Sequence, residues 1–326
     1  MQIIIIGDGA AGNAAAQKIR SLDKDVKVTM ISSEATSYYS RPRLPEFICG
    51  KTPEEKLIIH QSTWYTEQDI DLKLATEIIE IDPINKTIKS SNNQTFNYDK
   101  LLLAVGSTPN KPAISGVNLE NVFVLRTLED AKKIKMAVQG KSEIVAIGGG
   151  LLGLEVVDCL ADGTRDIKVI EHGQYLLSRQ LNELQAKHLQ DLLEDKNYQF
   201  YLAEDSAEIT KENNCLTVTT KSEKKISGDL ILLSCGVSAN LNLAKSANLK
   251  TDRGIIVNNF LKTSDPNIYA AGDCIQIEQT MWGFVKSSME QGQIAAENMV
   301  NDYQTEYLGT KIEPTLKIAG IDLKNL

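Results

Sequence analysis

The sequence contains no apolar run that approaches the length of a membrane-spanning helix, so we expect no transmembrane segment. It has no cluster of lysines or arginines, and 43 acidic residues against 35 basic ones give a net charge of −8. A nucleic-acid-binding surface needs concentrated positive charge, so this class of partner is not expected. No low-complexity tract interrupts the 326 residues, which are enough for two domains with separate cores.

Cysteine is scarce and scattered. None of the five cysteines belongs to a C-x-x-C pair, so we expect free, mostly buried thiols in a reducing cytoplasm, and no metal site. The N-terminus goes directly into a strand that the following motif needs, so we expect no signal peptide. The cysteines are Cys49, Cys159, Cys215, Cys235 and Cys274.

A glycine-rich turn at the start of the chain points to a ligand. Residues 3–6 are four isoleucines, which predict a buried parallel strand, and the sequence GDGAAG follows with the spacing G-x-G-x-x-G. Gly7 would make the tight turn, Gly9 would let the backbone approach a pyrophosphate, and Gly12 would let the next helix pack close to the strand. The N-terminal amides of that helix would face the phosphates.

The same pattern recurs more than a hundred residues later. Residues 143–147 predict a second buried strand, and residues 148–153 (GGGLLG) repeat the glycine spacing. Two fingerprints in one chain predict two dinucleotides. The alternative is a duplicated Rossmann core in which one or both sites are empty.

An acidic residue follows the next strand in each half. Glu34 follows the predicted strand 26–31, and Glu171 follows the strand 167–170. An acid at this position is expected to hydrogen-bond a ribose hydroxyl, although Glu34 could also be a solvated loop residue. Glu171 is followed by His172 and not by arginine, so a 2′-phosphate would meet a like charge, which favours NADH over NADPH. We expect His172 itself to be a surface residue.

Residues 38–45 (YYSRPRLP) predict a stiff loop, because each proline fixes its own φ and restrains its predecessor. Two arginines held in such a loop are well placed to meet phosphate or an acidic partner. A merely solvated basic loop is the alternative.

The two halves of the chain share one order of elements. Residues 72–95 predict a small β-meander, and residues 98–106 predict a buried strand that ends in a glycine turn. In the second half, strand-like pieces at 198–202 and 216–220 precede the matching segment 229–236. This internal repeat is the strongest architectural signal in the sequence.

The other segments are assigned more simply. Residues 116–127 are expected to connect the halves, while 128–138, 154–161 and 287–299 are expected to be helical. Asp273, just after a buried strand and a glycine turn, can accept hydrogen bonds from a polyol chain.

The chain resembles the pyridine nucleotide–disulfide oxidoreductases, which are flavoproteins with two dinucleotide sites. It is most similar to the NADH:rubredoxin reductase branch, which also includes the N-terminal part of NAD(P)H nitrite reductases. The matching segments cover nearly the whole chain in the family's order. They are residues 7–12, 40–44, 102–109, 148–155, Glu171, 229–240 and 263–273.

The resemblance implies an α/β fold with two Rossmann-like domains of three-layer ββα architecture, the NAD domain being inserted into the FAD domain. Residues 1–112 and 238–310 would form the split FAD domain, and residues 113–237 the NAD(H) domain. Residues 311–326 would begin a C-terminal third domain that is otherwise largely absent.

The resemblance also implies the cofactor contacts. The first turn and Glu34 would hold the FAD pyrophosphate and ribose, Asp273 the ribityl chain, and the backbone near Val285 the pyrimidine edge of the flavin. The implied FAD residues are Gly7, Gly9, Ala10, Ala11, Gly12, Ser33, Glu34, Arg41, Pro42, Ile78, Ala104, Gly106, Asp273, Val285 and Lys317. The implied NADH residues are Gly148, Gly150, Leu152, Gly153, Glu155, Glu171 and Gly236. Glu155 would lie where nicotinamide and flavin meet, and it is the only catalytic candidate.

The chain departs from the family pattern at its redox centre. Residues 40–42 read Ser-Arg-Pro where the disulfide and peroxidase branches place reactive cysteine, so those mechanisms lose their nucleophile. Ferredoxin-type reductases have a lysine at the position of Glu46, and it pairs with the glutamate of the second fingerprint. Here Glu46 and Glu155 are expected to repel each other.

Two further departures lie at the ends of the chain. Asp8 places a carboxylate inside the phosphate turn, so its side chain is expected to point away from the pyrophosphate. Residues 314–323 resemble the first strand of the family's third domain, and both a natural short form and a truncated chain remain open.

The predicted function is hydride transfer from NADH to FAD, followed by single-electron transfer to a small redox protein, with rubredoxin as the first choice. A reductase module for a nitrite reductase or a ferredoxin-type acceptor is the alternative. A flavoprotein that binds NADH in a sensing or scaffold role is a second one. Rubredoxins are generally acidic, so docking would need a local basic patch, for which we predict Arg41, Arg43 and Lys51.

Overall fold

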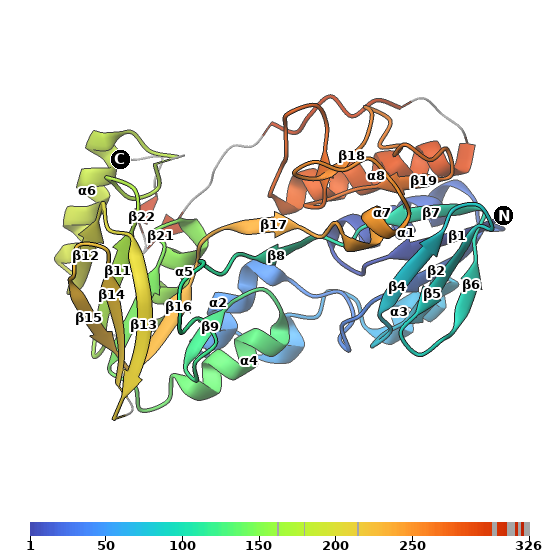
Figure 1. Cartoon of the computed structure of the whole chain (residues 1–326). Coiled ribbons are helices and arrows are strands. Elements are labelled where there is room, and N and C mark those ends of the chain that lie inside the picture. Colours follow the sequence, from blue (N-terminus) through green and yellow to red (C-terminus); the bar gives the residue numbers. More distant parts are fainter. Residues whose placement is uncertain are drawn as a thin grey trace. The chain divides into compact units, whose positions relative to one another are not determined.

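The computed structural model describes residues 1–161, 163–178, 180–213, 215–301 and 305–311, and the backbone of 317–318 and 321–322. Contacts divide the chain into two compact units, each described separately below (Figure 1). The first unit comprises Met1–Tyr39, Ile58–Thr108 and Ser238–Ile312, and the second includes Ser40–Leu57 and Pro109–Val237. Among the residues described, no helix combines the length and the apolar character that a bilayer span requires.

The first unit is built on a five-stranded parallel sheet with the order β19-β7-β1-β2-β3. The four isoleucines of β1 are at most 6% exposed, as expected of a central strand covered on both faces. Ile5 lies opposite Met30 on one side and Leu102 on the other. The strands are β1 (Gln2–Ile6), β2 (Lys27–Ile31), β3 (Ile70–Lys73), β7 (Lys100–Leu103) and β19 (Ile268–Ala270).

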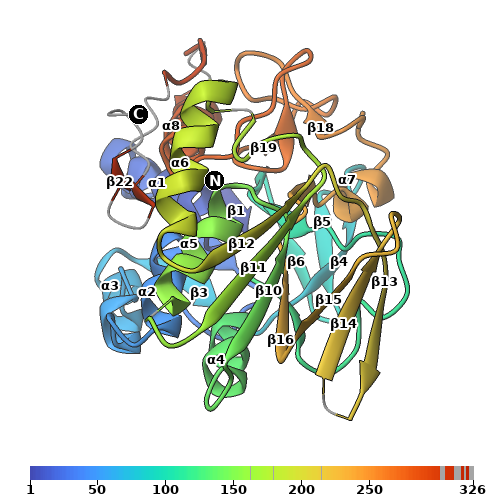
Figure 2. The same cartoon turned by 90° about the vertical axis from the view of Figure 1, so that its left-hand side faces the viewer.

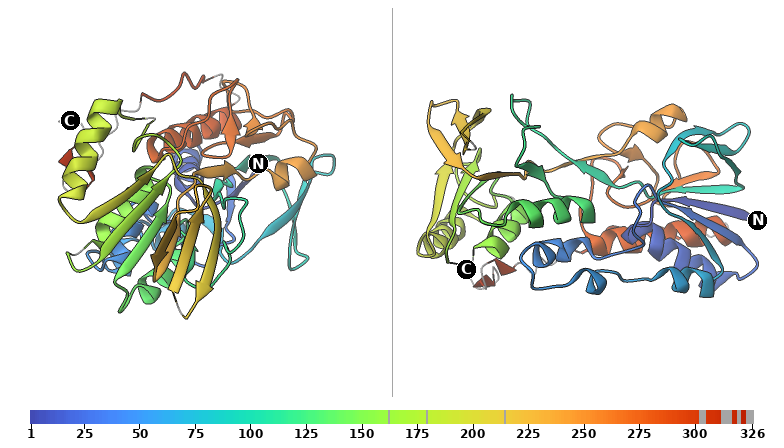
Figure 3. Two further views of the ribbon diagram at one scale, coloured as in Figure 1. Left: turned by 60° about the vertical axis from the view of Figure 1, so that its left-hand side comes forward. Right: turned by 90° about the horizontal axis from the view of Figure 1, so that it is seen from below.

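Helices α1 (Ala10–Leu22) and α8 (Val285–Asn301) of this unit pack closely against each other (Figure 3). A β-carbon on Gly292 would lie 2.1 Å from the carbonyl oxygen of Ala11, so only glycine permits this approach. Ala15 and Ala16 on α1 are fully buried. Small side chains therefore set the distance between the two helices.

An antiparallel sheet, β4-β5-β6, shares the core of the first unit and confirms the predicted meander. Ile78, Ile81 and Ile88 on these strands belong to the same buried cluster as Ile3 and Leu102. The smaller elements of the unit are β4 (Ile78–Asp82), β5 (Thr87–Ser90), β6 (Thr95–Asn97), α3 (Ser62–Glu67), α7 (Asn242–Ser246), β18 (Ile255–Ile256) and β20 (Ile275–Gln276).

The second unit repeats the plan of the first. Its parallel sheet has the order β12-β11-β10-β16-β9, and Figure 2 shows β10, β11 and β12 side by side. An antiparallel sheet, β13-β14-β15, accompanies it. The elements are β9 (Val122–Val124), α4 (Leu128–Ala137), β10 (Glu143–Ile147), α5 (Leu151–Leu160), β11 (Asp166–Glu171), α6 (Glu183–Glu194), β12 (Tyr198–Leu202), β13 (Ser206–Glu212), β14 (Cys215–Thr220), β15 (Lys225–Gly228) and β16 (Leu230–Leu233).

The predicted α/β fold with two Rossmann-like sheets is therefore confirmed, although some local assignments differ. Residues 116–127, expected as a connecting segment, contain the edge strand β9, which pairs with β16 in parallel. A three-residue strand has no periodic pattern of its own, and pairing with β16 creates it. Strands β8 (Ser107–Pro109) and β17 (Val237–Ala239) form a two-stranded sheet at the points in the sequence where the chain leaves and re-enters the first unit. The backbone of β21 (Lys317–Ile318) pairs with that of β22 (Ile321–Asp322).

Residues 40–57 group with the second unit and not with the first, and they are helical. Their elements are η1 (Arg41–Arg43), α2 (Leu44–Ile48) and η2 (Glu54–Lys56). Pro42 and Pro45 occupy first-turn positions, where the missing N–H costs no helical hydrogen bond. The predicted stiff loop is thus a pair of short helices.

Candidate dinucleotide sites

The first glycine turn has the geometry that its spacing predicts. Gly7 has φ of +112°, and a β-carbon there would lie 2.2 Å from the carbonyl oxygen of Ala104. A β-carbon on Gly12 would lie 1.9 Å from the carbonyl oxygen of Gly7, so α1 can start this close to β1 only with glycine. A β-carbon on Gly9 would meet no atom within 4 Å. The turn is tight on two sides and open at Gly9.

Helix α1 begins at this opening without a capping side chain. Its N-cap is Gly9, and no acidic residue lies in its first turn. The first hydrogen bond of the helix runs from the N–H of Asn13 to the Gly9 carbonyl (2.9 Å). The N–H groups of Ala10, Ala11 and Gly12 therefore have no acceptor within the helix. An uncapped helix N-terminus beside an open glycine fits a pyrophosphate.

Asp8 is turned into the protein by three donors. The hydroxyl of Tyr65 donates to both carboxylate oxygens (2.9 and 2.8 Å), the N–H of Tyr38 to one (2.9 Å), and the amide of Asn13 to the other (3.3 Å). Burial raises the pKa of Asp8 to about 6, although these hydrogen bonds act to lower it. The same burial and the Asp8 charge raise the pKa of Tyr65.

The turn before Asp273 lies next to the first fingerprint. A β-carbon on Gly272 would lie 3.2 Å from the Ala11 side chain, and the Ser107 hydroxyl donates to Asp273 (3.1 Å). The Gln291 carbonyl accepts from the N–H of Gly272 (2.8 Å), while its fully buried NH₂ has no hydrogen-bond partner among the described residues. A buried NH₂ without a hydrogen-bond acceptor close to this turn is consistent with a bound ligand that provides the acceptor.

The other predicted FAD residues have more varied surroundings. The Tyr39 hydroxyl donates to Glu34 (2.6 Å), and Ser33 is exposed. Ala104 follows β7 and is buried, and Gly106 has φ of +65°. The structure thus brings the first turn, Ala104 and the Asp273 turn together in one unit.

Five predicted FAD residues are not brought to this turn by any contact described. Ile78 is buried in β4, and Val285 is 40% exposed at the start of α8. Arg41 and Pro42 belong to the second unit by contacts, where the Arg41 guanidinium donates to the carbonyl of Arg126 (2.9 Å). Lys317 lies in β21, and its side chain is outside the described residues. Their roles stay predictions.

The second glycine turn reproduces the first. Gly148 has φ of +109°, and a β-carbon there would lie 2.3 Å from the carbonyl oxygen of Ser234. A β-carbon on Gly153 would lie 2.6 Å from the carbonyl of Gly148, and one on Gly150 would meet nothing within 4 Å. Gly150 is also the N-cap of α5 and has no side-chain cap. Ser234 holds the place that Ala104 holds in the first unit.

Glu171 is fixed by the backbone of its own turn region. One carboxylate oxygen accepts from the N–H of Gly149 (2.6 Å), and the other accepts from the N–H of Gly173 (2.7 Å). This places an oriented negative charge beside the second fingerprint, where an adenosine ribose is expected. His172 is an exposed residue that pairs with Asp205 (2.6 Å), as predicted for a surface position.

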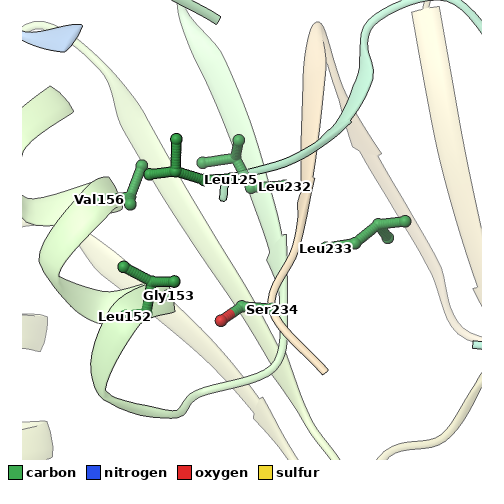
Figure 4. A pocket seen from close by; sticks show the side chains of 7 residues that line it. All are labelled: Leu125, Leu152, Gly153, Val156, Leu232, Leu233 and Ser234. Atoms are coloured by element: carbon green, nitrogen blue, oxygen red, sulfur yellow. The ribbon is translucent and has the colours of Figure 1, made fainter. Parts of the chain in front are cut away.

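A small apolar pocket lies beside the second fingerprint (Figure 4). It lies where the strand order reverses between β10 and β16, which is the position at which open α/β sheets bind ligands. Leu152 and Gly153 were predicted site residues. The pocket adds Leu125, Val156, Leu232, Leu233 and Ser234. The strand-to-glycine repeat, which aligns Ser234 with Ala104, was the signal that could have identified Ser234. Gly236, two residues further on, has φ of +78°.

Glu155 and Glu46 do not act as the predicted repelling pair. Burial alone raises the pKa of Glu155. The pKa of Glu46 is lowered by hydrogen bonds from Thr52 (2.6 Å) and Arg43 (3.0 Å). Arg43 and Thr52 thus compensate the charge of Glu46, whereas no charged partner acts on the pKa of Glu155.

Two parallel sheets of one plan, each with an open glycine turn and an acid at a strand end, define an α/β protein of the two-dinucleotide class. Residues 1–298 match the family model of the pyridine nucleotide-disulphide oxidoreductases. The chain belongs to this family, which confirms the predicted resemblance.

Two relatives and one solved structure illustrate what the chain is similar to. The chain is 32% identical over 323 residues to an assimilatory nitrate reductase electron transfer subunit of Bacillus subtilis (strain 168), covering 99% of this chain and 42% of that protein. It is 31% identical over 327 residues to an NADH-rubredoxin oxidoreductase of Clostridium acetobutylicum, covering 99% and 80%. The crystal structure of NADH:rubredoxin oxidoreductase from Clostridium acetobutylicum matches with a TM-score of 0.84 and 28% identity, covering 98% and 80%.

Proposed function

We propose that the protein is an FAD-dependent NADH oxidoreductase that delivers electrons to a small redox protein. The duplicated turn supports this proposal most directly, because Gly9 and Gly150 are both open at an uncapped helix N-terminus. FAD would bind at the first turn and NADH at the second. When bound, FAD supplies hydride acceptance and single-electron release, and the protein supplies binding, orientation and exclusion of water.

The residues of the second unit would select and orient the nicotinamide cofactor. Glu171 would accept from ribose hydroxyls and repel a 2′-phosphate, so NADH is the proposed donor. The apolar pocket beside Leu152 and Gly153 would exclude water from the cofactor. Glu155 is half-buried with a raised pKa, so its neutral form persists to higher pH than that of an ordinary glutamate. No side chain is required as a general acid or base.

Rubredoxin is the proposed acceptor, because a relative and a solved structure that cover nearly the whole chain carry that name. The second candidate is a reductase module for a nitrite reductase or a ferredoxin-type acceptor. The relatives of that type favour it, although the chain spans only 42% and 40% of their lengths.

An anaerobic spectral titration tests both parts of the proposal. The purified protein is expected to show a two-band flavin spectrum that bleaches with NADH far more readily than with NADPH. Rubredoxin and ferredoxin are then added separately to the bleached sample. Fast reoxidation by rubredoxin supports the proposed acceptor, whereas fast reoxidation by ferredoxin alone favours the second candidate. A colourless protein that takes up no added FAD would contradict the enzyme proposal.

A further inference from the structure

Two of the five cysteines lie side by side in the second unit. The sulfurs of Cys49 and Cys159 are 3.0 Å apart, although 110 positions separate them in the sequence. Cys49 follows α2 as its C-cap, and Cys159 lies in the last turn of α5. Both side chains are partly exposed, whereas Cys274 is buried. All five cysteines are free thiols, as expected, but only Cys274 is buried, so the expectation of mostly buried thiols was wrong.

The two sulfurs are close enough that a covalent bond requires little movement. Helix α2 packs against α5, so the two residues are held on adjacent elements. A disulfide has a sulfur–sulfur length of about 2.05 Å, so the sulfurs need to approach by only about 1 Å. Side-chain rotation can supply a movement of this size.

The surroundings distinguish the roles of the two sulfurs. Burial, followed by the neighbouring Cys49, raises the pKa of Cys159 to about 12, so Cys159 remains a thiol. The Lys51 ammonium acts in the opposite direction on Cys159, but more weakly than burial and Cys49. Neither Cys49 nor Cys159 is buried, so a small oxidant can approach the pair from solvent.

We propose that Cys49 and Cys159 form a reversible disulfide when the protein meets hydrogen peroxide. The Cys49 thiolate attacks one peroxide oxygen, the O–O bond breaks, and the departing hydroxide takes up a proton to become water. Cys159 then attacks the resulting sulfenic sulfur, the S–S bond forms, and the S–O bond breaks with loss of a second water. Two thiols and one peroxide give one disulfide and two waters, so the sulfurs lose the two electrons that the peroxide gains.

The bond would join residues 40–57 to the helix that starts at the second glycine turn. Glu155 lies four residues before Cys159 on that helix, so the bond would also restrain the region of the predicted nicotinamide site. Closing a loop of this length restricts the unfolded chain, so the oxidised protein is expected to melt several degrees higher. This modification is independent of the proposed electron acceptor.

Intact mass, thiol count and melting temperature test the proposal on the full chain. The reduced protein is freed of reductant and treated with hydrogen peroxide. We expect a loss of about 2 Da, two fewer titratable thiols, faster migration on a non-reducing gel, and reversal of all three by dithiothreitol. Cys49→Ser and Cys159→Ser should each abolish the mass loss. Cys215→Ser, which removes an exposed thiol, should react like the parent protein.

Protease digestion of the unsubstituted oxidised protein makes the test independent of how the variants fold. A disulfide-linked peptide pair that contains Cys49 and Cys159 supports the proposal. Oxygen addition at Cys49 without the linked pair would overturn it, as would a mass loss that survives in Cys159→Ser.

Discussion

Asp8 lies in the middle of a turn that is expected to receive phosphate, and its protonation is therefore important. Its side chain is 9% exposed and accepts hydrogen bonds from Tyr65, Tyr38 and Asn13. Burial raises its pKa from 3.8 to about 6, with a smaller contribution of the same sign from the charge of Glu34. The structure thus satisfies the carboxylate with protein donors, as the expected orientation away from the pyrophosphate requires.

The raised pKa predicts a pH dependence of stability. The folded state binds the proton of the Asp8 carboxyl more tightly than the unfolded state does. Protonation of Asp8 therefore stabilises the fold fully below pH 3.8, and this stabilisation is lost as pH rises through about 6. A shift of about two units corresponds to at most about 3 kcal/mol. Asp8→Asn removes the ionisation, so its melting temperature should fall less than that of the parent protein between about pH 4 and pH 7.

Melting curves at several pH values provide the measurement. Asp25→Asn at an exposed position is the matched control and should keep the parent's pH profile. Identical profiles for Asp8→Asn and the parent protein would show that Asp8 is not the group responsible.

At the level of elements, substitutions of Gly9 and Gly12 in the first turn should have different effects. In Gly12→Ala, the new methyl group would overlap the backbone carbonyl of Gly7, so α1 must move from β1 at a cost of about 3 kcal/mol. In Gly9→Ala, the methyl group meets no protein atom, and the backbone there is extended (φ −99°). This second variant should fold normally but bind FAD weakly, because the methyl group would occupy the space expected for pyrophosphate.

Melting temperature and FAD titration of the apoproteins separate these two outcomes. Gly150→Ala is the control, because Gly150 is the equivalent open position of the second turn and its substitution should not change FAD binding. If Gly9→Ala bound FAD as tightly as the parent protein, the pyrophosphate could not lie against Gly9.

What the sequence predicted well is local in the chain. The isoleucine run, the glycine spacing and the acid at each strand end specify the strand, turn and helix within about 30 residues. What it did not predict depends on distant partners. Asp8 accepts a hydrogen bond from Tyr65, which lies 57 residues further along the chain, and Cys49 contacts Cys159 across 110 residues. No periodicity encodes such pairs, and the same holds for the grouping of residues 40–57 with the inserted unit.

At the level of the whole molecule, net charge and local charge have to be separated. The chain carries −8, so long-range attraction cannot bring an acidic acceptor to it. The predicted patch is also weaker than its composition suggests. Arg43 is paired with Glu46 and hydrogen-bonded to Thr52, and Arg41 donates to the backbone of Arg126. Lys51 is the exposed member of the three and the most informative position to change.

Lys51→Glu should lower kcat/KM for rubredoxin reduction by about three- to tenfold at low salt, because a charge at the rim of an interface mainly changes the association rate. The effect should shrink at high salt as the charges are screened. Reduction of a neutral quinone by NADH should be unaffected. Lys24→Glu, also at an exposed position, gives the same net charge of −8 − 2 = −10 and controls for long-range repulsion. Equal losses in both variants would assign the effect to net charge and remove the basis for a local docking patch at residues 41–51.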